Sequence, residues 1–436
     1  MSGARQHASR SLGLGTLAAL VVGEVIGIGI FLTPADMARS LGSPGLLLVV
    51  WLVSGLMALS GALAYGALAV RFPEAGGPYV YLRQAWGGTT AFLYGWKCLL
   101  VLDPGLTAAW ASGVAQYTSA LLPIGPAGAT AVAVCTILVL AGLNALGTRV
   151  GARVLIVVTV LKVVSLGLMI GWGFLSGRGA VGHFGPFWER AAGSPALGAA
   201  LAGGFVSAFF SFGGWWDAAK MAGEARDPER SLPRAFTLGV LAVTLVYVLT
   251  SAVFVYLIPI PEASSATAFA AVVGEKLFGR AGAQVLAAMV LVAVLGSLSA
   301  YVLSAPRVYL AMAGDGLFPA ALARRHSRLG TPLGAIAVQA GLASLLVAVG
   351  TFGEIVAYVL FATVAFIGLS VAALLVLPGE NGRAWWLRPA VMVFLALTAL
   401  LLVLLALNSP RQAALGTAVV LLGIPVRAWL RRKEAR

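Results

Sequence analysis

The run VVGEVIGIGIFLTP at residues 21–34 places three glycines in the middle of the first long apolar segment. Gly23 and Gly27 have the spacing that allows close helix packing. Gly27 and Gly29 flank Ile28, and two glycines around one residue weaken an α-helix enough to permit an unwound segment. Unwinding exposes N–H groups at the start of one half-helix and C=O groups at the end of the other. These ends attract a carboxylate and an ammonium group, respectively.

A second break is predicted at residues 209–217, FFSFGGWWD, where Gly213 and Gly214 are adjacent within the sixth apolar segment. The two breaks occupy corresponding positions if segments one to five and six to ten are inverted repeats. Two interrupted helices in such positions are typical of a secondary transporter with its binding site at the membrane midplane.

The composition indicates a polytopic membrane protein. Of the 436 residues, 60% are hydrophobic and 10% are charged, whereas about 25% are charged in an average soluble protein. Apolar runs recur that are long enough to cross about 30 Å of hydrocarbon as helices. The predicted spans are 13–40, 45–70, 87–118, 127–147, 152–176, 197–222, 233–259, 281–313, 332–350, 354–377, 388–408 and 412–430.

The 29 lysine and arginine residues set the predicted orientation. With both termini in the cytoplasm, most of them, including Lys220 and Arg307, fall in cytoplasmic segments, as the positive-inside rule requires. Those assigned to the outer side are Arg39, Arg178, Arg190, Lys276, Arg280 and Arg411. The net charge of +14 is therefore a topology signal, and a nucleic-acid partner is not expected.

Four motifs are similar to those of a known family. GIGIF at 27–31 resembles the G-[small]-G-I-F motif of the amino acid–polyamine–organocation superfamily, and EARDPERSLPRA at 224–235 resembles its signature after span six. PRVYLAMAGDG at 306–316 resembles the end of span eight, and PEAGGPY at 73–79 resembles the loop after span two. The matches extend over spans one to eight, and the chain resembles the L-type amino acid transporter branch.

The resemblance implies an all-α polytopic membrane protein of twelve transmembrane helices with the LeuT-type five-plus-five inverted repeat. Helices one and six are discontinuous in that fold. The first repeat then covers residues 1–176, the second covers 197–377, and two added helices with a cytoplasmic tail cover 388–436. The resemblance also implies a sodium-independent amino acid transporter of the plasma membrane that alternates access, with exchange as the favoured mode. A proton-coupled symporter and a cationic amino acid or polyamine carrier stay open.

The two breaks predict a site for both ends of an amino acid. The N–H groups of Gly27, Ile28 and Gly29 are expected to hold the carboxylate. The carbonyl groups expected to hold the amine are those of Val25, Ile26, Phe210, Ser211 and Gly213. In the family, the aromatic residue that matches Phe210 closes the site to the outside, so the resemblance assigns a gating role to Phe210. The family usually has a small residue at the position of Ile28, which predicts a tighter carboxylate pocket.

Lys162 lies inside span five, about 15 Å from the start of the span by helical rise, which is far for a snorkelling side chain. The family resemblance implies instead that its ammonium group occupies the place of a sodium ion and bridges span one to span eight. Ser297 and Ser299 on span eight are its candidate polar neighbours.

The other charged residues that the sequence places deep within predicted spans, where a charge is costly, are Glu24, Asp103 and Lys97. Glu24 is interpreted as a carboxylate facing a cytoplasmic vestibule, as a counter-charge for Lys162, or as a proton carrier. Asp103 either contacts a cationic substrate side chain or caps the kink at Pro104, and the kink is favoured. Lys97 is expected to snorkel to the inner face.

Other functional classes find little support. The three histidines lie far apart in predicted loops, and no zinc-protease or P-loop motif indicates an enzyme, a metal site or a cofactor. Polar rings of a channel are not evident. Cys98 and Cys135 are interpreted as packing thiols. The loop at 119–128 lacks the cysteine that tethers the heavy-chain partner of animal family members, so that partner is not expected. The expected partners are an amino acid and membrane lipid.

Overall fold

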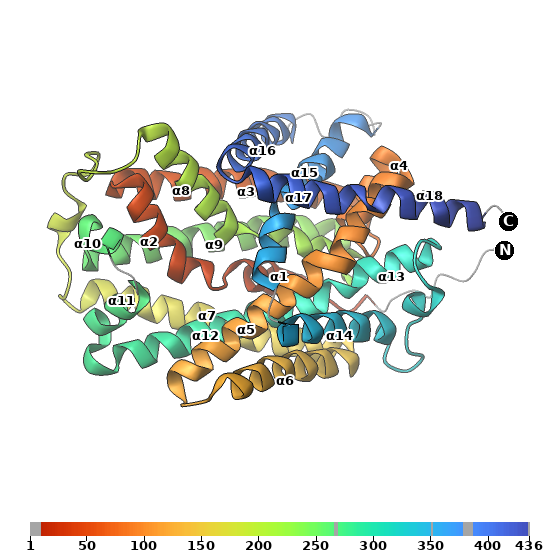
Figure 1. Cartoon of the computed structure of the whole chain (residues 1–436), viewed down its shortest axis with the longest axis horizontal. Helices are drawn as coiled ribbons and strands as arrows, with labels where there is room; N and C mark the ends of the chain where they lie inside the picture. Colours follow the sequence, from red (N-terminus) through yellow and green to blue (C-terminus); the bar gives the residue numbers. More distant parts are fainter. Residues whose placement is uncertain (1–9, 266–268, 350–351, 378–386, 435–436) are drawn as a thin grey trace.

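The computed structural model describes residues 10–265, 269–349, 352–377 and 387–434, and these are almost entirely helical (Figure 1). Two non-α elements matter below: the π-helical turn η1 (Cys98–Leu102) and the 3₁₀ helix η3 (Trp215–Glu224). The α-helices are α1 (Leu14–Val25), α2 (Gly29–Leu41), α3 (Pro44–Arg71), α4 (Pro78–Lys97), α5 (Asp103–Leu121), α6 (Pro126–Ala145), α7 (Thr148–Leu175), α8 (Leu197–Phe212), α9 (Pro228–Leu257), α10 (Ile260–Ser265), α11 (Phe269–Phe278), α12 (Gly282–Ser304), α13 (Pro306–Gly314), α14 (Leu333–Val349), α15 (Phe352–Val376), α16 (Arg388–Asn408), α17 (Pro410–Leu421) and α18 (Gly423–Glu434).

The prediction of a polytopic membrane protein is confirmed. In the described ranges, nine helical runs are long and apolar enough to cross a membrane. Shorter apolar helices lie at Leu14–Val25, Leu333–Val349 and Leu360–Val376. Together these segments coincide with the twelve predicted spans. The structure therefore accounts for the high hydrophobic content as membrane-crossing helices.

The two predicted helix breaks are present. Span one is interrupted at residues 26–28, between α1 and α2. Span six is interrupted between α8 and η3, where Gly214 has a φ of 114°. That left-handed value is open to glycine and strained for residues with a side chain, so the turn depends on Gly214. The glycine-rich sequences therefore break both helices for a local backbone reason.

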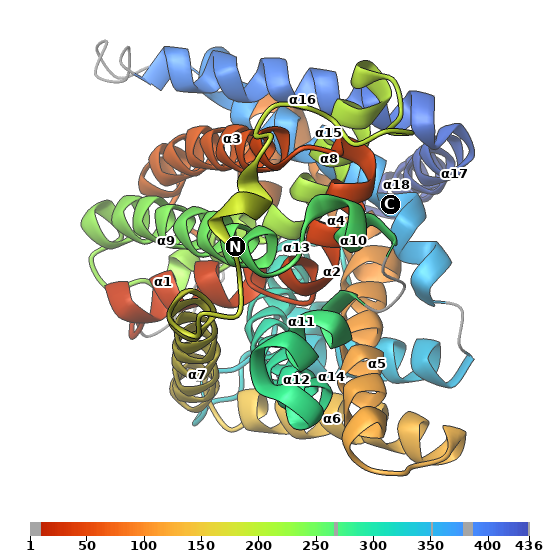
Figure 2. The same cartoon turned by 90° about the vertical axis from the view of Figure 1, so that its left-hand side faces the viewer.

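The broken span one lies inside the bundle. Seen end-on, α3 and α16 lie above it and α12 and α6 lie below it (Figure 2). The half-helix α1 packs against α7, α9, α12 and η3, and α2 packs against α8. The unwound segments are thus surrounded by helices that can supply partners for their free backbone groups.

One predicted span boundary agrees with a break in the backbone, and one differs. Span three was expected to begin at residue 87, where Gly87, with a non-helical φ of 83°, divides α4 into two helical parts, the first of which begins at Pro78. Span seven was expected to begin at 233, but α9 begins at Pro228 and contains Pro233.

One end of the bundle is tied together by a buried ion pair. Arg307 was assigned to a cytoplasmic segment, but it is fully buried. Its Nε lies 3.0 Å from Oε1 of Glu224, and this pairing explains how the charge is accommodated. The backbone of Glu224 also accepts a hydrogen bond from the Leu12 N–H at 3.0 Å, and the Arg226 N–H donates to the Leu12 carbonyl at 2.7 Å. The start of the chain is thereby attached to the end of η3.

We predict that Glu224→Gln destabilises the protein by about 3–5 kcal/mol, because it leaves the buried Arg307 guanidinium without a counter-charge. Thermal unfolding in detergent, followed by size-exclusion chromatography, measures the effect. Asp36→Asn is the control, since the Asp36–Arg39 pair is half exposed and such pairs contribute less than about 1 kcal/mol. Equal melting temperatures for the two variants would contradict the stabilising role of the buried pair.

Candidate functional site

The unwound segment of span one presents free backbone donors. Within the described ranges, the N–H groups of Gly27, Ile28 and Gly29 donate to no protein acceptor. Farther along the backbone, the Phe31 N–H donates a hydrogen bond to the Ile28 carbonyl at 3.1 Å. Consecutive unpaired amides at the start of a helix attract an anion. The structure therefore leaves available the donors that were predicted to hold a carboxylate.

The carbonyl side of the two breaks is tied together by Tyr247 of α9. Its buried hydroxyl lies 2.8 Å from the carbonyl oxygens of both Val25 and Ser211. The side chain of Ser211 also lies 2.9 Å from the Thr33 hydroxyl on α2. Sequence reasoning missed Tyr247, because a tyrosine in an apolar span gives no signal of which backbone groups it will reach.

The close approach of the two broken spans requires Gly29. A Cβ added to Gly29 would lie 3.0 Å from the backbone Cα of Ser211 and 2.7 Å from its hydroxyl. This glycine therefore permits helix unwinding and also lets α2 reach the end of α8.

Lys162 connects three helices at the break. Its Nζ donates to the carbonyl oxygens of Gly23 at 2.9 Å and Ile26 at 2.5 Å, and it lies 3.4 Å from the Ser297 hydroxyl. The lysine is fully buried, so snorkelling is wrong. The Ser299 hydroxyl is buried without a hydrogen-bond partner in the described ranges. Lys162 and Ser297 thus both bond carbonyl oxygens of span one, whereas Ser299 does not.

A buried charge cluster lies next to the break. Lys220 was assigned to a cytoplasmic segment, but it is fully buried. Its Nζ lies 2.9 Å from Asp217 and 3.8 Å from Asp103. The favoured interpretation of Asp103 as a kink cap is wrong, because its two oxygens accept hydrogen bonds from Tyr301 at 2.5 Å and Tyr309 at 2.8 Å. The π-helical turn η1 ends directly before Asp103. Sequence spacing could not reveal this cluster, because its members come from different spans.

Glu24 lies beside the cluster and is also buried. Its Oε1 accepts a hydrogen bond from Ser304 at 2.7 Å, while Oε2 has no partner in the described ranges. Glu24 interacts electrostatically with Asp217 and Lys220. Among the described residues it forms no direct ion pair with Lys162, whose ammonium group is held by backbone carbonyls, but the two groups interact electrostatically.

The aromatic residues around the second break differ in exposure. Phe210, the predicted gate, is 52% exposed. Its carbonyl accepts a hydrogen bond from the Gly213 N–H at 3.3 Å, which closes the turn. Phe209 stacks on Trp216 with ring centres 6.2 Å apart. Phe212 is buried against Tyr247. Of these rings, Phe210 is the most exposed, and its gating role stays a prediction.

Lys97 does not snorkel, contrary to expectation. It is fully buried, and its Nζ donates to the Thr363 hydroxyl at 2.7 Å. The same ammonium lies 5.2 Å from the ring centre of Tyr94 and 5.7 Å from that of Phe366. Cation–π attraction and one hydroxyl therefore accommodate this charge.

Residues 12–426, nearly the whole chain, match the family described as amino acid permease. The chain belongs to the amino acid permease family. This permease is 30% identical over 440 residues to Asc-type amino acid transporter 1 of Mus musculus, covering 96% of this chain and 80% of that protein. It is 30% identical over 441 residues to large neutral amino acids transporter small subunit 2 of Homo sapiens, covering 96% and 79%.

A bacterial relative of the permease is the serine/threonine exchanger of Bacillus subtilis. The two are 29% identical over 343 residues, which cover 77% of this chain and 76% of that protein. The predicted membership of the amino acid–polyamine–organocation superfamily, near its L-type branch, is confirmed. The permease is accordingly a transporter and not an enzyme.

We predict that Tyr247→Phe weakens amino acid exchange by the permease about five- to tenfold, since losing one hydrogen bond costs about 1 kcal/mol. The loss should appear mainly in KM, because the hydroxyl fixes carbonyls at the edge of the binding site. Initial uptake rates over a range of substrate concentrations measure it.

Tyr256→Phe is the matched control for this variant. Tyr256 lies on the same helix, and its ring contacts Phe174 far from the break. Equal KM values for Tyr247→Phe and Tyr256→Phe would contradict the role given to the Tyr247 hydroxyl.

Proposed function

We propose that the permease exchanges neutral amino acids across the plasma membrane by alternating access, without sodium. The observation that carries this proposal is the set of free N–H groups at Gly27, Ile28 and Gly29, next to carbonyl groups fixed by Lys162. Free amides suit a substrate carboxylate. Protein donors already bond carbonyl oxygens at both breaks, but a carbonyl oxygen can accept two hydrogen bonds, so these groups can also accept one from the substrate amine. The printed names of its relatives, which include amino acid transporters and an exchanger, support the same substrate class.

Sodium independence follows from the position of Lys162. Its ammonium group already contacts the Gly23 and Ile26 carbonyls and lies near the Ser297 hydroxyl. Oxygen ligands of this kind are those that a small cation would use. A covalently attached cation fulfils the same electrostatic role, and it leaves no oxygen cluster free for a sodium ion.

A neutral substrate is favoured over a cationic one by the pairing of Lys220. Besides Glu24, the buried carboxylates near the site are Asp103 and Asp217, and a cationic substrate side chain would seek them. Lys220 is already close to both, at 3.8 Å and 2.9 Å. The protein thus supplies its own cation to these two carboxylates.

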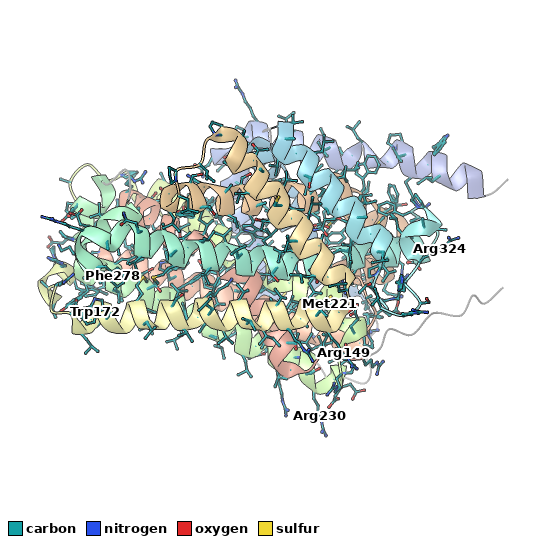
Figure 3. The ribbon with its side chains drawn as sticks, turned by 90° about the horizontal axis from the view of Figure 1, so that it is seen from below. Arg149, Trp172, Met221, Arg230, Phe278 and Arg324 are labelled. Carbon is teal, nitrogen blue, oxygen red and sulfur yellow. The ribbon has the colours of Figure 1, made fainter. Side chains whose placement is uncertain are left out.

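We propose that the end of the bundle with Arg149, Arg230 and Arg324 faces the cytoplasm (Figure 3). Trp172 and Phe278 lie at the opposite end in the same view, as an aromatic belt at the outer interface would. The backbone of Glu224, whose side chain pairs with Arg307, accepts a hydrogen bond from the Leu12 N–H. This contact places Leu12 at the arginine-rich end and supports a cytoplasmic N-terminus.

The remaining architectural expectations are also proposals. The breaks at 26–28 and at Gly213–Gly214 support inverted repeats at residues 1–176 and 197–377, followed by 388–436. We propose that no disulfide-linked heavy chain is required. The absence of cysteine at 119–128 and the burial of Cys98 support this. Cys135 is exposed, so its interpretation as a packing thiol is wrong, but it lies within α6 and outside that loop.

We predict that Lys162→Ala abolishes or severely slows exchange while the protein still folds and reaches the membrane. The carbonyl groups of Gly23 and Ile26 then lose the cation that holds α1 against α12. Uptake of labelled L-serine and L-leucine into proteoliposomes, with sodium or choline as the external cation, tests this. Wild-type uptake that requires sodium, or full activity of Lys162→Ala, would contradict the assignment.

We predict that uptake depends on amino acid inside the vesicle. Proteoliposomes preloaded with unlabelled L-serine should accumulate labelled L-serine at least tenfold faster than empty ones, because in an exchanger the loaded carrier reorients readily. Equal initial rates in empty and loaded vesicles would instead indicate uniport or symport. Competition by excess L-lysine or putrescine in the same assay would favour the cationic alternative.

A further inference from the structure

We propose that Glu24 is a proton-binding site that opens to the cytoplasm, so that the permease binds one proton when its inner end closes and releases it when that end opens. This inference rests on the proposed function and orientation. It concerns how the inner half of the pathway closes, and not which amino acid is carried.

The first argument is the count of buried charges. Glu24, Asp103, Asp217 and Lys220 are each at most 4% exposed. These are three carboxylates and one ammonium group in the interior of a membrane protein, where unpaired charge is strongly disfavoured. With every carboxylate ionised, these four side chains would carry two excess negative charges. Lys162 and Lys97 also interact electrostatically with the carboxylates, but two backbone carbonyls bind the ammonium group of Lys162 and a hydroxyl binds that of Lys97. Binding a proton on one carboxylate reduces this excess without any new cation.

The second argument identifies which carboxylate takes the proton. Asp103 accepts two tyrosine hydroxyl hydrogen bonds and lies 3.8 Å from the Lys220 ammonium, and Asp217 lies 2.9 Å from that ammonium. Both are thus stabilised as anions. Glu24 receives one hydroxyl bond, from Ser304, and its Oε2 has no partner in the described ranges. Glu24 is therefore the carboxylate for which protonation removes the most unfavourable charge.

The groups that face Glu24 from each neighbouring helix support this assignment. From η3 come the Asp217 carboxylate, which repels an ionised Glu24, and the Lys220 ammonium, which is shared between Asp217 and Asp103. From α7 comes Lys162, whose ammonium is held by two backbone carbonyls. From α12, the Ser304 hydroxyl donates to Glu24, and Tyr301, one turn earlier, bonds Asp103. From α9, the Tyr247 hydroxyl bonds the carbonyl of the adjacent Val25.

The third argument concerns the side from which the proton comes. Glu24 belongs to α1, which packs against η3. The Gly214 turn contacts Glu24 directly, since a Cβ on Gly214 would lie 3.1 Å from the Glu24 Cβ. Beyond Glu24, the contacts of Leu12 with Glu224 and Arg226 tie the start of the chain to the end of η3. Separation of α1 from η3 would admit cytoplasmic water to the carboxylate.

The proton balance is simple. On closing, one proton moves from cytoplasmic water to the Glu24 carboxylate and gives a neutral acid. On opening, the same carboxyl group returns one proton to cytoplasmic water. The proton does not cross the membrane, so the step makes closure depend on pH without making the permease a proton symporter.

The test compares Glu24→Gln with Glu24→Asp and with Asp36→Asn, a carboxylate variant at a half-exposed position of the same span. Exchange of labelled for unlabelled L-serine is measured in loaded proteoliposomes between about pH 5.5 and 8.5 on both sides. Wild type, Glu24→Asp and Asp36→Asn should slow as the pH rises, approaching tenfold per pH unit when closure limits the rate. Glu24→Gln is neutral at every pH and should show a flat profile.

A spectroscopic measurement covers the case in which Glu24→Gln does not transport. Infrared spectra of the purified protein at neutral pH should contain a protonated carboxylic-acid C=O band that Asp36→Asn keeps and Glu24→Gln lacks. Retention of this band in Glu24→Gln, or a wild-type pH profile in that variant, would overturn the proposal. Uptake of L-serine into empty vesicles driven by a pH gradient alone would also overturn it, because the proton would then cross the membrane. Failure of exchange in the wild type itself would instead refute the proposed function.

Discussion

A peptide group inside a membrane has no water to bond, and the two interrupted spans leave several such groups unpaired. The protein meets this constraint unevenly. Carbonyl oxygens at the breaks receive side-chain donors from Lys162 of α7, Tyr247 of α9 and Ser297 of α12. The N–H groups of Gly27, Ile28 and Gly29 have no acceptor within the described ranges. The protein thus supplies hydrogen-bond donors to the carbonyl oxygens at the breaks and leaves the N–H groups for a ligand.

Buried lysines follow the same principle with three different kinds of partner. Lys162 is surrounded by carbonyl dipoles, Lys220 lies between carboxylates, and Lys97 lies against a hydroxyl and two aromatic rings. Each arrangement lowers the cost of a cation in an apolar interior by a different interaction. Internal cations are therefore part of how neighbouring spans are held together, and their positions limit which mobile ions and substrates the site accommodates.

The sequence predicted the local features and missed the ones that depend on packing. The spans and both breaks were predicted correctly, because apolar length and adjacent glycines act within a few residues of the chain. Lys220 and Arg307 were misplaced because each lies near the end of an apolar run, where spacing alone favours a solvent-facing side chain. Their burial depends on Asp217, Asp103 and Glu224, which approach only after the spans pack. Tyr247 is a tyrosine within an apolar span, and such a residue usually only packs. The sequence therefore could not predict that its hydroxyl bonds carbonyl groups at both breaks.

The second half of span six is wound as a 3₁₀ helix over ten residues, from Trp215 to Glu224. Such a helix rises about 2.0 Å per residue, compared with about 1.5 Å in an α-helix, so this stretch is about 5 Å longer than α-helical winding would make it. Trp215 and Met221 of this stretch are buried in the bundle. The extra length therefore places the Glu224 carboxylate farther from the glycine turn, where it lies 3.6 Å from the Arg325 guanidinium.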